Sequence, residues 1–212
     1  MKISFSQPGL PSTGTVVVTA ISGAKLSATA AKLDEITGGA IKRAMRIIRF
    51  KGNKGQSLDI LAPSGVGIDR IMLIGLGKAT DVDRLDMQDL GGKIYAETGM
   101  GERGKVTVAV DLIPEGQINA ADAAAQMGFG ARLRSYRFDK YRTKKKEGDT
   151  PSIKTMVFQC SGFVKARTIF RSLDKIADGV FFTRDLVSEP ANVLYPDSFA
   201  KRIKSLEKLG VK

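Results

Sequence analysis

The sequence contains no histidine and a single cysteine, Cys160, among its 212 residues. Without histidine, the chain has neither a Ser-His-Asp nor a Cys-His catalytic centre, and no histidine-based zinc site. One cysteine excludes a thiolate zinc cluster and an intramolecular disulfide, and it is consistent with a reducing, cytoplasmic location. No dense group of carboxylates takes the place of these ligands. We therefore predict no catalytic residue, no metal ligand and no cofactor site in this chain.

Long apolar runs and a secretory leader are also missing. No run approaches the ~18 apolar residues of a membrane span, and the first eight residues, MKISFSQP, lack the apolar core of a signal peptide. The hydrophobic fraction of 42% is nevertheless sufficient for a buried core. We expect a cytoplasmic protein without a membrane partner.

Strand-like and helix-like segments alternate through the first 160 residues. Runs rich in β-branched and apolar residues predict strands at 2–6, 15–21, 57–62, 68–76, 105–111 and 153–160. Composition and position between the strands predict helices at 27–47, 82–98 and 119–134. We expect the first helix to break at Gly38-Gly39, and Thr80 and Asp83 to form a capping pair for the second. The alternation favours an α/β fold, a three-layer α/β/α arrangement around a mixed sheet that is mostly parallel with an antiparallel edge strand.

Residues 165–189 read as one long helix that Pro190 ends. Its expected apolar stripe consists of Ile169, Leu173, Ile176, Val180 and Val187. Twenty-five helical residues would span roughly 37 Å, a length that suits a rod between two domains. We interpret the chain as a first domain over 1–164, a linker helix over 165–190 and the truncated start of a second domain over 191–212. In the last part, one helix would carry Phe199, Ile203, Leu206 and Leu209 on a single face.

Most of the formal net charge of +12 comes from one segment. Residues 131–146 contain eight basic side chains against Asp139 alone, interleaved with three aromatic ones. Such a composition is typical of a nucleic-acid surface. The candidate nucleic-acid-binding residues are Arg142, Lys144, Lys145 and Lys146. The alternatives are a solvated loop whose aromatic residues Tyr136 and Phe138 anchor in the core, or a contact with an acidic face of another subunit.

Three weaker signals have a structural as well as a functional interpretation. Gly75-x-Gly77-Lys78 sits between a predicted strand and a helix, where either an anion site or a tight turn with positive φ is expected. Acidic residues recur along the long helix at Asp174, Asp178, Asp185 and Glu189, as a metal pair or, more simply, as a polar face balanced by Arg171, Lys175 and Arg184. Cys160 lies in an apolar strand and is expected to be a buried structural thiol.

Two stretches resemble a known family. Residues 136–145, YRFDKYRTKK, are similar to the "YRFD-x-Y-(K/R)-(S/T)-K" segment of the cytosolic leucyl aminopeptidases, the M17 metallopeptidases. Residues 184–196, RDLVSEPANVLYP, resemble the "RDLVNEPANxLxP" signature at the domain junction of that family. The LDE-x-TGG sequence at 33–39 and the GLGK sequence at 75–78 also match, so the resemblance spans the whole chain.

The resemblance implies a macro-domain-like, non-catalytic N-terminal domain that serves assembly or regulation of a two-domain peptidase. The catalytic domain of such an enzyme removes N-terminal residues, preferably leucine, with two divalent metal ions (zinc, manganese or magnesium), in a hexamer. The family's "KGxxFDSGG" and "NTDAEGR" motifs do not occur here, so no catalytic or metal residue carries over and this chain alone should not hydrolyse peptides. By analogy with macro domains, a site for a nucleotide or ADP-ribose is a further hypothesis.

Overall fold

The computed structural model describes residues 1–99, 104–144 and 150–211. Within these residues, a seven-stranded sheet has the order β1-β7-β6-β2-β5-β4, and the short β3 pairs with β2 outside this order. The strands are β1 (Lys2–Ser6), β2 (Thr15–Ile21), β3 (Lys25–Leu26), β4 (Ser57–Leu61), β5 (Arg70–Gly75), β6 (Gly104–Val110) and β7 (Ile153–Cys160). The helices are α1 (Ala28–Ile36), α2 (Ala40–Ile47), α3 (Arg84–Thr98), α4 (Ala120–Arg134), α5 (Phe163–Ser188) and α6 (Pro196–Lys204), with short 3-10 helices at Ala79–Asp81 and Ser205–Leu209.

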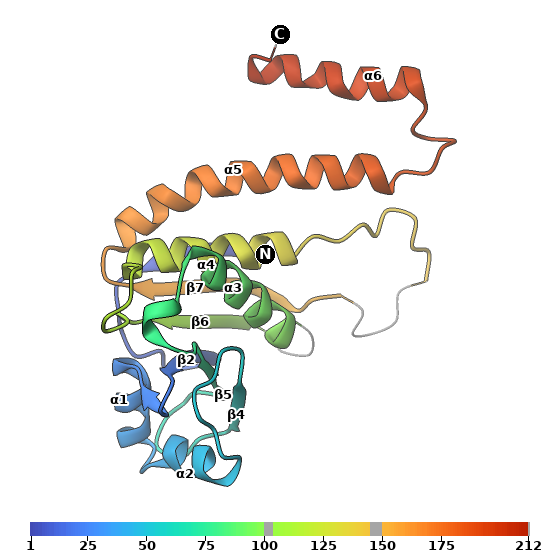
Figure 1. The fold of residues 1–212 in the computed structure, drawn as a ribbon. Helices are drawn as coiled ribbons and strands as arrows, with labels where there is room; N and C mark the ends of the chain where they lie inside the picture. The colour runs from blue at the N-terminus through green and yellow to red at the C-terminus, as the bar shows by residue number, and fades with distance from the viewer. Residues whose placement is uncertain (100–103, 145–149, 212) are drawn as a thin grey trace.

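The sheet separates two hydrophobic cores, as predicted for a three-layer α/β/α fold (Figure 1). Successive residues of a strand point to opposite faces. Val17 of β2 therefore packs with α3, α4 and α5, whereas Val16 and Val18 pack with α1 and α2. The pairings along the main order are parallel except for β4 with β5, which confirms the mostly parallel sheet and its antiparallel edge strand.

Local signals placed some helix ends correctly and one incorrectly. Gly38 and Gly39 adopt positive φ angles of 63° and 81° and separate α1 from α2, as expected. The predicted Thr80–Asp83 capping pair is wrong, because Thr80 lies in a 3-10 helix. Asp83 is instead the N-cap of α3 and exchanges two hydrogen bonds with Asp86, in which Asp86 N donates over 2.8 Å and Asp83 N over 3.2 Å.

The long helix α5 is a layer helix in its first half. Ala166, Phe170 and Ala177 are its buried residues, and the Phe170 ring lies 5.2 Å from that of Phe5 in β1. The expected apolar stripe is therefore partly wrong, since Ile176 is 55% exposed and Val187 is 82% exposed. Two of the three buried residues are alanines because α5 packs closely against the alanine- and glycine-rich α4. Phe170 fits there because it faces Gly128, where an added Cβ would lie 3.1 Å from the ring.

The chain beyond Pro190 lies apart from the sheet (Figure 1). No residue of α6 or of the 3-10 helix that follows is buried. The apolar side chains Phe199, Ile203 and Leu209 are 41%, 44% and 78% exposed. Among the described residues, no helix combines the length and the apolar character that crossing a bilayer would require.

Candidate functional site

The last turn of α4 is joined to the acidic face of α5. Arg132 donates from Nε to Asp174 over 3.0 Å and from Nη2 to Asp178 over 3.1 Å. Its guanidinium carbon also lies 4.5 Å from the ring centroid of Phe181. Charge-assisted hydrogen bonds of this kind are stronger than neutral ones. The first basic residue of the segment 131–146 is thus paired within the molecule.

The following turn continues the same contact along α5. The Tyr136 hydroxyl donates to Asp185 over 2.9 Å, and the Tyr136 ring lies 5.2 Å from that of Phe181. Arg184 donates to the Leu133 carbonyl over 3.2 Å and lies over the Tyr136 ring at 5.4 Å. Tyr136 is therefore half-buried against α5, not anchored in the main core as the loop alternative supposed.

A carboxylate with a buried side chain lies at the C-terminal end of α5. The Glu189 side chain is only 3% exposed and accepts hydrogen bonds from Lys140 at 2.7 Å, from Arg202 of α6 at 3.0 Å and from the Tyr141 hydroxyl. The donation from Lys140, then that from Tyr141 and that from Arg202, hold the pKa of Glu189 at about 2, below its ordinary value of 4.5. We call Lys140, Tyr141, Glu189 and Arg202 the junction latch. Through the Glu189 side chain, it connects the segment after α4, the end of α5 and α6.

These contacts explain the acidic residues of α5 without a metal ion. Asp174, Asp178, Asp185 and Glu189 each have a basic or tyrosine partner. The expected balance by Lys175 is present, 3.1 Å from Asp178, but most partners come from α4 and the basic segment, 42 to 49 residues away. In the described parts of the chain, no three His, Cys, Asp or Glu residues lie together as metal ligands would.

The four candidate nucleic-acid-binding residues are placed only in part. Arg142 lies 3.9 Å from Asp139, and Lys144 is exposed. Lys145 and Lys146 lie outside the described residues. A nucleic-acid role for this set stays a prediction, to which neither the fold nor its contacts add support.

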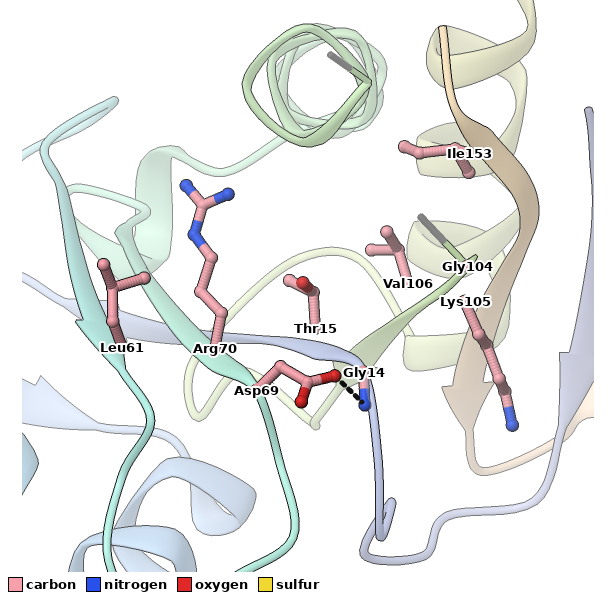
Figure 2. A pocket seen from close by; sticks show the side chains of 9 residues that line it. All are labelled: Gly14, Thr15, Leu61, Asp69, Arg70, Gly104, Lys105, Val106 and Ile153. Atoms are coloured by element: carbon pink, nitrogen blue, oxygen red, sulfur yellow. Dashed lines mark hydrogen bonds between the residues drawn. The ribbon is translucent and has the colours of Figure 1, made fainter. Parts of the chain in front are cut away.

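One cavity, of about 300 Å³, lies at the amino ends of the parallel strands (Figure 2). Two of the three charged side chains that line it, Asp69 and Arg70, already have structural partners. Asp69 accepts a hydrogen bond from Gly14 N over 3.0 Å, and Arg70 binds Asp59 through two contacts of 2.8 Å. Lys105 points away from Arg70 in Figure 2. This cavity is therefore better explained as a crevice between packed strands than as a binding site.

A second cavity, of about 350 Å³, lies at the carboxyl ends of β2, β5 and β6. In open α/β sheets, ligands commonly bind at this edge where the strand order reverses. Here, however, Asp111 occupies the N-terminus of α1, where its carboxylate accepts from Thr29 N at 2.9 Å and from the Thr29 hydroxyl at 2.8 Å. Glu115 lines the same cavity. Lys25 is the one basic residue among the lining residues, so the two carboxylates outnumber it and the electrostatics do not favour the phosphates of a nucleotide or of ADP-ribose.

The remaining sequence signals have structural explanations. Gly77 has a φ of +81°, and a Cβ on Gly75 would lie 2.2 Å from the Asn53 carbonyl oxygen, so the glycines serve a tight turn. Cys160 is fully buried, and burial raises the pKa of its thiol to about 11. The expected structural thiol is confirmed.

Several solved peptidases and related enzymes share this fold. A mutant of tomato leucine aminopeptidase superposes with a TM-score of 0.77 at 20% identity, over 99% of this chain and 42% of that chain. The bottromycin maturation enzyme BotP gives 0.69 at 21% identity, over 93% and 38%. At these identities the likeness establishes the fold alone, and it confirms the predicted α/β class.

Sequence comparison adds the family. The profile of the "Cytosol aminopeptidase family, N-terminal domain" matches residues 16–145. The probable cytosol aminopeptidases of Rhodopseudomonas palustris and Caulobacter vibrioides are each 39% identical, over 212 and 215 residues, which is 100% of this chain and 42% of each relative. The chain therefore belongs to the cytosol aminopeptidase family and contains its N-terminal domain, as the resemblance indicated. It spans less than half the length of these relatives.

Proposed function

We propose that this chain is the non-catalytic N-terminal part of a metal-dependent leucyl aminopeptidase, which removes N-terminal amino acids from peptides. Its own role in that enzyme is assembly or regulation. The observation that carries the proposal is the family match over residues 16–145, together with relatives that align with this chain over only 42% of their length.

The proposed domain division is a first domain over 1–164, a linker helix over 165–190 and the start of a catalytic domain over 191–212. The exposure of Phe199, Ile203 and Leu209 supports it, because an amphipathic helix normally buries such side chains. We propose that further residues of the catalytic domain cover this face. The junction latch would then fix the direction in which α6 leaves α5.

The donor set of the described residues does not fit a pair of divalent ions. The carboxylates of α5 are engaged by arginine, lysine and tyrosine, and none of them lies in a group of three potential ligands. We therefore assign zinc, manganese or magnesium to the catalytic part of the enzyme, where two such ions would activate water and the peptide carbonyl. One solved neighbour, BotP, is in complex with Mn.

The parent enzyme is further proposed to be hexameric and cytoplasmic, as the resemblance implies. The relatives carry the name cytosol aminopeptidase. Mass measurement of the longer protein by light scattering tests the assembly, and a monomer at working concentration would contradict it.

Hydrolysis of leucine p-nitroanilide by the 212-residue chain and by a longer protein that contains it tests the activity. Each is assayed with Mn²⁺, Zn²⁺ and Mg²⁺ in turn. We expect the longer protein to hydrolyse the substrate and the 212-residue chain to remain at the background rate. Hydrolysis by the short chain, or inactivity of the folded longer protein with all three metals, would refute the proposal.

A further inference from the structure

The cavity at the carboxyl ends of β2, β5 and β6 combines an apolar wall with charged groups of both signs. Its volume of about 350 Å³ suits a small ligand. Hydrophobic side chains form most of the wall: Ala20, Ile21, Leu26, Ala28, Leu76, Leu112, Ile113 and Pro114. Leu112 is 70% exposed, so a ligand that covers it would remove apolar surface from water. We call this hollow the carboxyl-end cavity.

Two charged side chains of the lining have no partner. Lys25 belongs to β3, and Glu115 lies in the turn after β6. Both are exposed, and among the described residues neither lies at salt-bridge distance from an opposite charge. Lys25 and Glu115 thus line one cavity without pairing with each other. A ligand that carries separate positive and negative groups would pair with both.

Two further polar groups of the lining can accept or donate hydrogen bonds. Thr19 of β2 is only 6% exposed, and its hydroxyl forms no hydrogen bond within the described residues. Buried polar side chains normally have a partner, so this hydroxyl beside a cavity is a position for a ligand atom. Asp111 accepts one hydrogen bond from Thr29 at each carboxylate oxygen, and each oxygen keeps a second lone pair.

We propose that the carboxyl-end cavity binds a free α-amino acid with an apolar side chain. Asp111 and Glu115 bind its ammonium group, and Lys25 binds its carboxylate. The apolar wall covers its side chain, and the Thr19 hydroxyl supplies a further hydrogen bond. A free amino acid is the product of an aminopeptidase, so the site would let the enzyme respond to its own product. That last step alone rests on the proposed function.

A simple amine is the competing ligand. It would use Asp111 and Glu115 but would leave Lys25 without a partner and near a second positive charge. Like charges at short range repel each other, whereas the carboxylate of an amino acid attracts the lysine. The presence of both signs in the lining therefore favours the amino acid, and the amide of the same amino acid serves as the comparison ligand.

The test is an NMR titration of the isotope-labelled 212-residue chain with leucine, leucinamide and N-acetylleucine. Leucine should shift the amide resonances of residues 19–28 and 111–115 and leave those of α5 unchanged. Leucinamide lacks the carboxylate, and N-acetylleucine lacks the ammonium group. Each should bind at least about fivefold more weakly than leucine, which is the loss expected for one exposed ion pair.

The test variants are Lys25→Met and Glu115→Gln. The matched controls are Lys32→Met and Glu35→Gln, at exposed positions of α1 outside the lining. Lys25→Met should lower the affinity for leucine about fivefold and leave the affinity for leucinamide unchanged. Glu115→Gln should weaken the binding of leucine and of leucinamide alike, and the controls should alter neither.

Three results would overturn the proposal: no amide shift with millimolar leucine, equal affinity for leucine and N-acetylleucine, or an equal loss in the test and control variants. The spectrum of each variant also reports whether it is folded. Failure of this titration would leave the aminopeptidase proposal intact, because hydrolysis of leucine p-nitroanilide is measured on the longer protein. Conversely, an inactive longer protein would remove the role of the ligand as a product but not its binding.

Discussion

The two basic regions of this chain differ in what the folded molecule places beside them. In the segment 131–144, Arg132, Tyr136 and Lys140 contact a row of carboxylates on α5 and at Glu189, the residue that follows it. Around α2, five basic residues are exposed, and among the described residues only Lys42 lies at salt-bridge distance from a carboxylate: Lys42, Arg43, Arg46, Arg49 and Lys51. Both regions are strongly basic in the sequence, with eight basic and one acidic residue over 131–146 and six basic and no acidic residues over 36–58. Only the tertiary structure distinguishes a segment that holds two helices together from a surface that is available to a partner.

We expect the largest loss of stability from a substitution that weakens the packing of α5. This helix carries carboxylates that pair with the segment 131–144. Phe170→Ala removes a buried ring that contacts Phe5 and should lower the free energy of unfolding by about 3–5 kcal/mol. Urea denaturation measures it. Phe199→Ala, at a position that is 41% exposed, is the control and should cost less than about 0.5 kcal/mol. Equal losses in the two variants would contradict the packing described for α5.

Breaking the junction latch should destabilise residues 138–144 and 196–204 without affecting α2. Glu189→Gln removes the charge that Lys140 and Arg202 share, in a side chain that is only 3% exposed. We expect faster amide exchange at 138–144 and 196–204, with unchanged exchange in α2. Hydrogen exchange with mass spectrometry measures both. Glu207→Gln, at an exposed position near the C-terminus, should change neither.

The stability that the junction latch contributes depends on pH. The folded pKa of Glu189, about 2, lies below its ordinary 4.5. The carboxylate therefore contributes stability fully above about pH 4.5, and this contribution is lost as the pH falls through 2. An NMR titration of the Glu189 side-chain carboxyl measures the pKa directly, and Lys140→Met should raise it, since Lys140 is the largest cause of the shift. An unshifted midpoint in the unaltered chain would show that the latch is not formed in solution.

We expect the smallest effect from substitutions of the residues that the sequence analysis proposed as nucleic-acid-binding. Lys144→Ala, Lys145→Ala and Lys146→Ala together should leave the anisotropy of a labelled DNA duplex unchanged, because neither the fold nor the contacts of these residues support a nucleic-acid role. Fluorescence anisotropy over a series of NaCl concentrations measures it. Duplex binding by the unaltered chain that this triple variant abolishes would show that the sequence-based assignment is correct.

The fold was largely predictable because its signals are local. Buried strands such as 15–21 and 153–160 are short apolar runs, and the helix break at Gly38-Gly39 follows from positive φ. The errors arose where contacts with neighbouring elements determine the local structure. Thr80 satisfied the spacing of a cap, but a 3-10 turn left that role to Asp83. On α5, periodicity favoured the large residue Ile176, whereas a close neighbour required the small Ala177.

The site was predicted less well because its contacts are distant in sequence. Nothing local to Arg132 reveals that Asp174 will lie beside it, 42 residues away. A complementary acidic repeat on α5 was visible and was interpreted within its own helix only. The basic residues around α2 also carried a signal, the complete absence of acidic residues over 36–58, but the larger charge of 131–146 drew the interpretation to that segment.

The half-buried position of α5 limits where the chain can be truncated without exposing the core. A fragment that stops at residue 164 would uncover the α4 surface that Phe170 now seals, together with the ring of Phe5 on the sheet. Such a fragment should aggregate on expression, whereas one that continues past Ala177 should remain soluble. The helix that leads away from the α/β unit thus also completes the hydrophobic core of that unit.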